Sequence, residues 1–152
     1  MNAVVSHENE LLLNTVQCFL NDEIYPHEDA VDRSGEVPLE LGRQIEARAK
    51  EVGLFAANLP EAVGGGGLNY TSSSIVEREY GKTTHALQSW IARPTELLLA
   101  CEGDQVARYL DPCVTGEKRE LFALTEPEAG SDVMGMKTNA KRDGRDWILN
   151  GS

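Results

Sequence analysis

The sequence predicts a mainly α-helical fold, in which a bundle of about five helices precedes the first strands of a β-domain. Two observations support this prediction. Apolar residues recur at helical spacing from Ser6 to about residue 114, and after Thr115-Gly116 they alternate with polar residues instead. We therefore expect an α-helical domain over residues 1–116 and the beginning of an incomplete β-domain over residues 117–152.

The first helix is expected from Ser6 to about Tyr25, because its apolar residues fall on one face and Asp22 and Glu23 fall on the other. Pro26 should end or kink this helix, since proline lacks the N–H that the helical ladder uses. The apolar stripe consists of Leu12, Leu13, Val16, Phe19, Leu20 and Ile24.

The second helix should open at Pro38, because proline suits the first helical position, and should stop at Gly53, a favourable C-terminal cap. Residues 55–67 then form a loop that contains Pro60 and ends in the four glycines of residues 64–67. No Gly-Lys-Ser/Thr sequence follows these glycines, so we interpret them as a flexible connector and not as a phosphate-binding loop.

Three more helices are expected over residues 70–81, 84–101 and 104–114, with Pro94 kinking the second of them. Inward-facing positions in these helices include Ile75, Val76, Tyr80, Leu87, Trp90, Ile91, Leu97, Leu98, Leu99, Val106, Tyr109 and Leu110.

Strands are expected at residues 121–125, 137–142 and 147–149, where apolar and polar residues alternate. Asp143-Gly144 lies between the last two and predicts a hairpin turn. The sequence contains no internal repeat.

Composition excludes several functional classes. The 152 residues carry a net charge of −11, which argues against nucleic-acid binding because that binding depends on lysine and arginine. Three scattered cysteines without a Cys-x-x-Cys spacing predict neither a disulfide framework nor a metal site. No window reaches the roughly 18 apolar residues of a membrane helix, and the start does not resemble a secretory signal. We expect a cytoplasmic protein that does not bind membranes.

The segment 121–132 holds the strongest candidate for chemistry. Alternation along its strand places Phe122 and Leu124 on one face, and Ala123 and Thr125 on the other. A small residue beside a hydroxyl suits a flat ring, because it allows close approach together with one hydrogen bond.

The turn that follows this strand is rich in hydrogen-bond donors. Pro127 cannot continue a strand ladder, so we expect free backbone N–H groups after it. Gly130 allows the main chain to approach a ligand, and Ser131 adds a hydroxyl. Three carboxylates would repel a phosphate there, so the donors must point away from Glu126, Glu128 and Asp132. Taken alone, this composition describes an ordinary surface turn after an edge strand.

The segment does not stand alone, because its sequence resembles the flavin-binding signature of the acyl-CoA dehydrogenase family. That family shows Leu-Thr-Glu-Pro, one variable residue and Ala-Gly-Ser-Asp, which matches residues 124–132. It also shows an apolar strand closing in Asn-Gly, matched at residues 147–151, and a Pro-Glu followed by glycines, matched at residues 60–67. The resemblance covers nearly all of the chain.

The resemblance implies FAD as the cofactor, bound by Phe122, Ala123, Leu124, Thr125, Gly130 and Ser131. The main chain and the Thr125 hydroxyl would meet the flavin ring, and Ser131 would meet the pyrophosphate. Ser131 would also touch the pantetheine of an acyl-CoA substrate. Glu128 replaces a glycine that is frequent in the family, and this carboxylate near the phosphates could weaken binding.

Arg93 lies with Ser89 and Trp90 where the family's fourth helix approaches the acyl chain. A guanidinium there could bind a polar or anionic acyl group through charge-assisted hydrogen bonds. Without the resemblance, the residue types favour the competing interpretation, in which Arg93 is exposed or paired within the protein. The basic residues Lys137, Lys141 and Arg142 could likewise meet CoA phosphates or form a solvated strand face.

The implied reaction is α,β-dehydrogenation of an acyl-CoA thioester, which needs a carboxylate base, a flavin and donors to the thioester carbonyl. The family's base is a glutamate of its C-terminal domain, and no acidic residue here matches it, so we assign no catalytic residue. We interpret the chain as an N-terminal part that is inactive by itself and binds FAD weakly or not at all. The resemblance also implies an electron-transfer flavoprotein as partner and a homo-oligomer, usually a tetramer.

Three alternatives remain. An acyl-CoA oxidase would pass its electrons to oxygen, and the sequence does not separate it from a dehydrogenase. A helical interaction module could retain the flavin turn without catalysis. A plain helical bundle with an unrelated hairpin would require the match at residues 122–132 to be coincidental.

Overall fold

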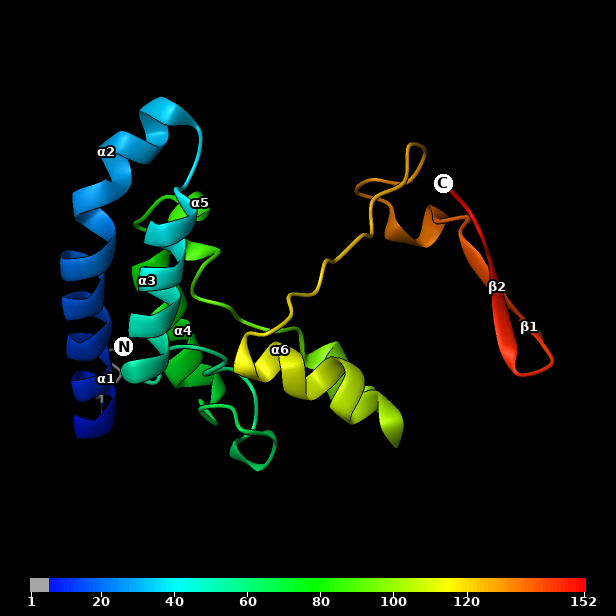
Figure 1. Cartoon of the computed structure of the whole chain (residues 1–152), viewed down its shortest axis with the longest axis horizontal. Coiled ribbons are helices and arrows are strands. Elements are labelled where there is room, and N and C mark those ends of the chain that lie inside the picture. Colours follow the sequence, from blue (N-terminus) through cyan, green and yellow to red (C-terminus); the bar gives the residue numbers. More distant parts are fainter. Residues whose placement is uncertain (1–5) are drawn as a thin grey trace, which may run out of the picture. The chain divides into compact units, whose positions relative to one another are not determined.

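The computed structural model describes residues 6–152 and divides into two compact units, one ending at Glu120 and the other beginning at Leu121 (Figure 1). The first unit is helical and the second carries a two-stranded sheet. The predicted fold class, a helical bundle followed by strands, is confirmed. Within residues 6–152, none of the helices combines the length and apolar character that a membrane crossing requires.

The first helix passes through Pro26 instead of ending there. It comprises α1 (His7–Phe19), a wider π-helical turn (Leu20–Ile24) and α2 (Tyr25–Ser34). The Ser6 hydroxyl caps its start by accepting a hydrogen bond from the Asn9 N–H, 3.2 Å away. A wider turn just before a proline is a recognised way to accommodate the missing N–H and the ring. Of the two outcomes expected at Pro26, an end or a kink, the first is wrong, because helical structure continues to Ser34.

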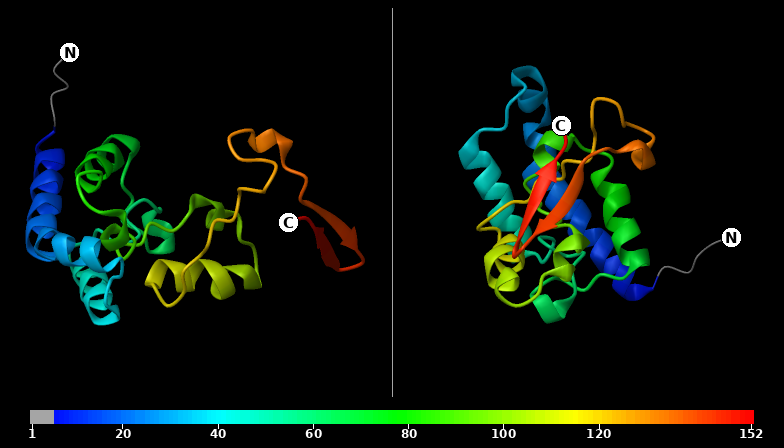
Figure 2. Two further views of the ribbon diagram at one scale, coloured as in Figure 1. Left: turned by 90° about the horizontal axis from the view of Figure 1, so that it is seen from above. Right: turned by 90° about the vertical axis from the view of Figure 1, so that its right-hand side faces the viewer.

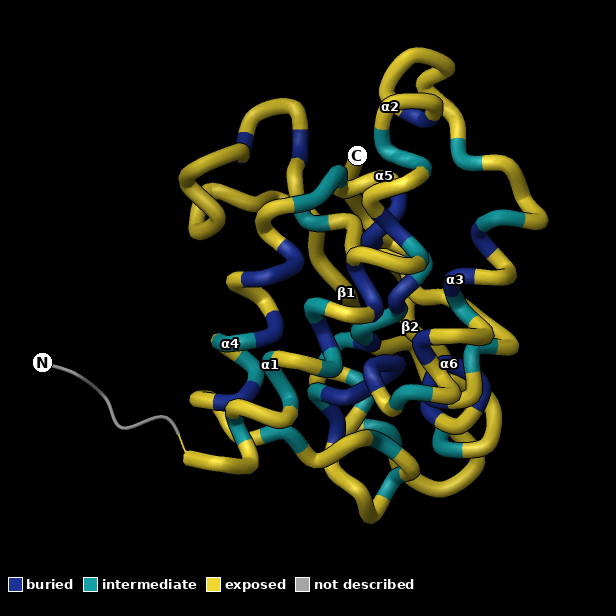
Figure 3. The backbone as a smooth tube through the Cα atoms, turned by 90° about the vertical axis from the view of Figure 1, so that its left-hand side faces the viewer, coloured by how far each residue is buried: buried dark blue, intermediate teal, exposed yellow. Residues whose placement is uncertain are grey.

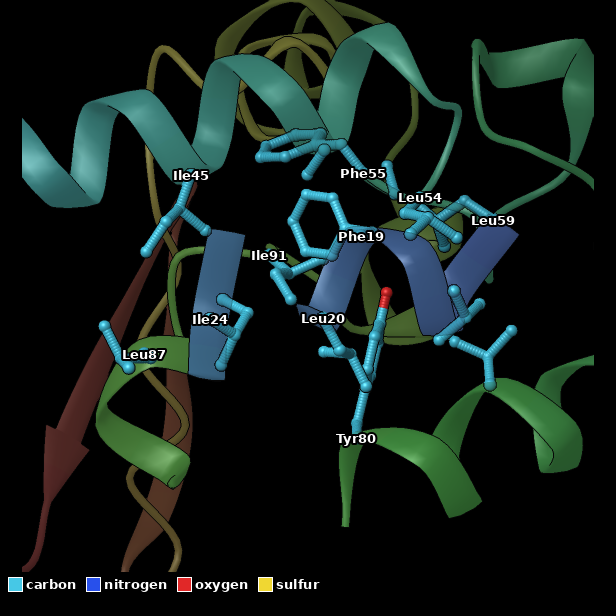
Figure 4. Packing of buried hydrophobic residues seen from close by; sticks show 14 of the residues in the cluster. Phe19, Leu20, Ile24, Ile45, Leu54, Phe55, Leu59, Tyr80, Leu87 and Ile91 are labelled. Atoms are coloured by element: carbon cyan, nitrogen blue, oxygen red, sulfur yellow. The ribbon is translucent and has the colours of Figure 1, made fainter. Parts of the chain in front are cut away.

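Helices α3 (Leu39–Glu51) and α4 (Tyr70–Tyr80) form as predicted. Pro38 precedes the first residue of α3, and Gly53, with a φ of 73°, follows its end. Helix α1 packs against α4, and the core lies where the helices meet (Figure 4). The largest fully buried side chains include Leu20, Ile24, Ile45, Leu54, Leu59, Tyr80, Leu87 and Ile91.

The fourth helix is the main error in the sequence-based prediction. Only a short helix α5 (His85–Gln88) and a 3₁₀ turn (Glu96–Ala100) form between residues 84 and 101. Between them the carbonyls of Ala92 and Pro94 accept hydrogen bonds from Ala56 N–H and the Asn58 amide, at 2.9 and 2.8 Å. These bonds to a distant loop replace the helical ladder. Without that helix, Leu97 and Leu99 are exposed and not inward-facing.

The last helix of the first unit spans a π turn (Val106–Leu110) and α6 (Asp111–Thr115), in agreement with the predicted fifth helix. Tyr109, predicted to face inward, is instead exposed. Gly116 follows it with a φ of 82°.

The glycine run is an ordered loop, so the expectation of a flexible connector is wrong. It follows a 3₁₀ turn (Glu61–Val63), and the N–H groups of Gly64, Gly65, Gly66 and Gly67 all donate to carbonyls of residues 56–61. A Cβ atom on Gly65 would lie 2.2 Å from the Leu59 carbonyl oxygen. Glycine is therefore required there for close packing, and the N–H groups are not available to a phosphate.

The second unit contains a 3₁₀ turn (Val133–Gly135) and the antiparallel strands β1 (Asn139–Asp143) and β2 (Asp146–Asn150), visible as the twisted hairpin in Figure 2. The turn consists of Gly144 and Arg145, one residue later than predicted, since Asp143 pairs with Asp146. Gly144 has a φ of 61°, which suits the first central position of a type II′ turn. Every residue of both strands is exposed, in contrast to the buried faces of α1, α3 and α4 (Figure 3).

Candidate functional site

The segment 121–125 is extended but forms no strand, contrary to the prediction. No described residue forms strand hydrogen bonds with this segment. An alternation of apolar and polar residues does not make a strand without such a partner. Leu121 and Phe122 expose 87% and 65% of their surface. Ala123 and Thr125 are also exposed, and Leu124 is half-buried. Apart from Leu124, the residues predicted to contact the flavin are therefore exposed.

Glu126 holds the turn that follows this segment. The Glu126 N–H donates to the Ala129 carbonyl at 3.1 Å, and the Glu126 carbonyl accepts the reverse bond from the Ala129 N–H at 3.2 Å, with Pro127 at the tip. Its carboxylate accepts one hydrogen bond from the Lys137 N–H and one from the Thr138 N–H, each 2.8 Å long. The side chain thereby ties the turn to the residues that precede β1.

These hydrogen bonds reduce the repulsion of phosphates that the sequence predicts for the carboxylates of this turn. Hydrogen bonds from Thr138, through its side chain and N–H, and from the Lys137 N–H lower the pKa of Glu126 below the ordinary glutamate value. Its carboxylate charge is thus satisfied by protein donors, and Glu128 pairs with the Lys137 ammonium at the surface. Two of the three carboxylates expected to repel a phosphate are therefore paired.

The donors of the turn lie at residues 130 and 131. The N–H groups of Glu126 and Ala129 are used by each other, so the expectation of free N–H groups throughout the turn is too broad. Among the described residues, none accepts a hydrogen bond from the N–H of Gly130 or Ser131. A Cβ atom on Gly130 would meet nothing within 4 Å. The backbone is therefore open on the Cβ side of Gly130, and the N–H groups of residues 130 and 131 are the donors that the turn offers.

The three basic residues near the hairpin do not form one patch. Lys141 and Arg142 are successive residues of β1, so their side chains project from opposite faces of the sheet. The Arg142 Nε donates to the Gly144 carbonyl at 3.2 Å, and Lys137 pairs with Glu128. Local pairing and exposure to solvent, and not a single strand face, account for these three residues.

In the helical unit, Arg93 is paired internally. Its Nη1 lies 3.2 Å from Glu77 Oε1, and its guanidinium lies 5.1 Å from the centroid of the Tyr80 ring. The Arg93 side chain is 26% exposed. Any ligand that binds this guanidinium must compete with the Glu77 carboxylate.

Arg93 lines a groove of about 290 Å³ in the same unit. The groove lies between the end of α5 and the segment after α6, and its other walls include Gln88, Ser89, Cys113 and Arg119. The guanidinium of Arg119 stacks on the Trp90 ring at 4.2 Å and pairs with Glu46 at 2.8 Å. Trp90 is consequently covered by protein, whereas Ser89 and Arg93 reach the groove.

Sequence reasoning missed two of these features. It treated Glu126 only as a repulsive charge, because nothing local in the sequence reveals donors 11 and 12 residues away. It also did not name Glu77 as the partner of Arg93. An acidic residue three positions before the buried Tyr80 on the same helix was the available signal, but pairing it with Arg93 required the path of the broken fourth helix.

A family model described as "Acyl-CoA dehydrogenase, N-terminal domain" matches residues 6–117, most of the helical unit. The chain belongs to the acyl-CoA dehydrogenase family. A relative in this family, the long-chain specific acyl-CoA dehydrogenase of Sus scrofa mitochondria, is 35% identical over 98% of the chain. The chain spans only 35% of that relative's length.

Two further similar proteins bear on the cofactor and the partner. The CarC subunit of the caffeyl-CoA reductase–Etf complex of Acetobacterium woodii is 34% identical over 96% of the chain, which spans 39% of it. The crystal structure of an acyl-CoA dehydrogenase from Bacillus anthracis complexed with FAD matches with a TM-score of 0.74 and 28% identity. That match covers 96% of the chain and 26% of the neighbour.

Proposed function

We propose that this chain supplies the N-terminal helical domain (1–116) and the beginning of the β-domain (117–152) of an FAD-dependent acyl-CoA dehydrogenase. The observation that carries the proposal is the turn at residues 126–131, where two N–H groups hold Glu126 and no described residue accepts a hydrogen bond from the N–H of Gly130 or Ser131. Its sequence resembles the family's flavin-binding signature.

In this proposal, the main chain of residues 122–125 and the Thr125 hydroxyl hold the flavin ring, and Gly130 and Ser131 hold the pyrophosphate. Bound FAD would supply the two-electron acceptor for oxidation of the Cα–Cβ bond. The chain's own contribution is positioning: Glu126 fixes the turn, and the open backbone at Gly130 allows close approach. We assign the proton-abstracting base to none of the described carboxylates.

Substrate contacts are proposed for Ser131, to the pantetheine, and for Arg93, to a polar or anionic acyl group. The groove beside Arg93 supports the second assignment, because its walls add the Ser89 hydroxyl and the cations of Lys118 and Arg119, against the one carboxylate of Glu120. The Glu77 ion pair must then be exchanged for the ligand. An apolar acyl chain would gain nothing from that exchange, since it cannot replace the lost pairing.

Electrons would pass to an electron-transfer flavoprotein, a proposal that the similarity to an Etf-complex subunit supports. We also propose a homo-oligomeric enzyme. An acyl-CoA oxidase remains the second candidate, distinguished by reoxidation of the reduced enzyme with oxygen.

The test is an anaerobic titration of the flavoprotein that contains these residues with a panel of acyl-CoA thioesters. Flavin bleaching by one thioester class supports the proposal and names the substrate class. A flavoprotein that no thioester reduces, or a protein without flavin, contradicts it. Ser131→Ala should weaken both FAD and acyl-CoA binding. The matched control is Ser74→Ala on α4, where the exposed hydroxyl donates only to the Tyr70 carbonyl.

A further inference from the structure

Two buried side-chain oxygens of the helical unit lack a hydrogen-bond partner among the described residues: the Tyr80 hydroxyl and Oδ1 of Asn58. Leaving a buried polar atom unpaired costs free energy, so each such atom in a folded protein calls for a physical explanation. Both residues line the same cavity, which has a volume of about 20 Å³. Because the two residues that carry these unpaired oxygens line one cavity, a single small partner there could satisfy both.

The size of the cavity restricts what that partner is. A single water needs roughly 10–15 Å³ of such volume and two to four polar partners, whereas an organic group needs more space. Apolar side chains, among them Leu54, Leu68 and Val76, form much of the remaining wall. We propose that this cavity binds one buried water molecule, which hydrogen-bonds to the Tyr80 hydroxyl and to Oδ1 of Asn58.

The chemistry of both groups suits a water. Burial raises the pKa of Tyr80 above its ordinary value, so its hydroxyl stays protonated and both donates and accepts. Figure 4 shows this hydroxyl directed from α4 into the cluster of buried side chains. The Asn58 Nδ2 donates to the Pro94 carbonyl at 2.8 Å, which fixes the amide orientation and leaves Oδ1 as the acceptor.

The water site links α4 to the loop that carries Arg93. Asn58 binds the Pro94 carbonyl, and the Ala56 N–H binds the Ala92 carbonyl, so the loop at residues 54–59 holds both neighbours of Arg93. The Arg93 guanidinium in turn lies over the Tyr80 ring. The water therefore closes a ring of contacts from Tyr80 through Asn58 to Arg93, and it is a positioning element for that side chain.

A crystal structure of the unmodified chain, at a resolution that places ordered waters, decides the proposal. The expected result is one water within roughly 2.7–3.2 Å of both the Tyr80 hydroxyl and Asn58 Oδ1. A direct hydrogen bond between the two side chains across a collapsed cavity overturns it. A cavity of unchanged shape without density for a water overturns it as well.

A second measurement compares Tyr80→Phe with Tyr70→Phe, its matched control on the same helix, where the side chain is 86% exposed. The number of long-lived waters, measured by ¹⁷O relaxation dispersion, should fall by one in Tyr80→Phe and stay constant in Tyr70→Phe. The Ala56 N–H should also exchange about fivefold faster in Tyr80→Phe, the ratio expected for the loss of one ordinary hydrogen bond. An unchanged water count in a folded Tyr80→Phe variant contradicts the proposal.

Discussion

Trp90 packs directly onto Gly42 of α3, so closely that a Cβ atom on the glycine would lie 2.1 Å from the indole Cε2. The same indole carries the Arg119 guanidinium, which also pairs with Glu46 of α3. A glycine inside a helix therefore allows the aromatic ring after α5 to reach the helix surface. This contact joins the segment of residues 89–95 to α3.

Gly42→Ala should destabilise the helical unit by about 2 kcal/mol. Alanine favours a helix over glycine by roughly 1 kcal/mol, but overpacking against a rigid ring costs about 3 kcal/mol at the upper end of the usual range. Thermal unfolding followed by far-ultraviolet circular dichroism measures the difference. Gly81→Ala is the control, since its added Cβ would find its nearest neighbour at 3.4 Å and its φ is −62°. Equal stability of the two variants would contradict the packing argument.

Glu79→Gln should lower the stability near neutral pH by about 2 kcal/mol, because it removes a buried charge-assisted partner from Lys82 and Arg78. The Glu79 side chain is 2% exposed and also accepts a hydrogen bond from Gln17 of α1 at 3.3 Å. The hydrogen bond from Lys82, above all, lowers the pKa of Glu79 below its ordinary value.

The pH dependence of this effect has a definite sign. A lowered folded-state pKa stabilises the fold fully above the unfolded-state value, and that stabilisation is lost as the pH falls through the folded-state value. The difference between wild type and Glu79→Gln should therefore shrink below about pH 4.3, the ordinary glutamate value. Urea unfolding across acidic pH measures it. Glu40→Gln, at an exposed pair with Arg43, serves as the control and should change stability little at any pH.

The sequence-based prediction is correct where local interactions determine the structure and wrong where residues distant in the sequence determine it. Helices α3 and α4 depend on local periodicity and caps, and both were predicted. The prediction of the fourth helix was wrong because the carbonyls of Ala92 and Pro94 accept hydrogen bonds from donors 36 residues away, the Ala56 N–H and the Asn58 amide. No property of residues 84–101 alone reveals those donors.

The candidate site shows the same limit. Residue types at 122–131 were sufficient to indicate a cofactor-binding turn and the family. They did not indicate that the Glu126 carboxylate binds the N–H groups of residues 137 and 138, since that contact depends on how the chain returns after the 3₁₀ turn (Val133–Gly135). Alternation at residues 121–125 likewise predicts a strand only where a partner strand is present.

Glu126→Gln should loosen the connection between the turn and β1. A carboxylate accepts both N–H bonds with its charge, whereas an amide offers one oxygen and places an NH₂ group against a second donor. The amides of Lys137 and Thr138 should exchange at least about tenfold faster, as measured by hydrogen exchange and NMR. Glu128→Gln is the matched control, because its carboxylate pairs only with the exposed Lys137 side chain. Equal protection in the two variants would show that Glu126 does not hold the turn.

Gly130→Ala separates a ligand-contact role of the turn from a structural one. A Cβ atom at this position meets nothing within 4 Å, and Gly130 is absent from the glycines with positive φ, so the fold of the second unit should be unchanged. In the flavoprotein that contains these residues, the added methyl group should stand between the backbone and the cofactor phosphates. FAD affinity should fall by roughly tenfold or more, about 1.4 kcal/mol or greater. The measurements are FAD titration by fluorescence and the hydrogen-exchange pattern of residues 126–138. Undiminished affinity in a variant with an unchanged exchange pattern would remove Gly130 from the proposed cofactor site.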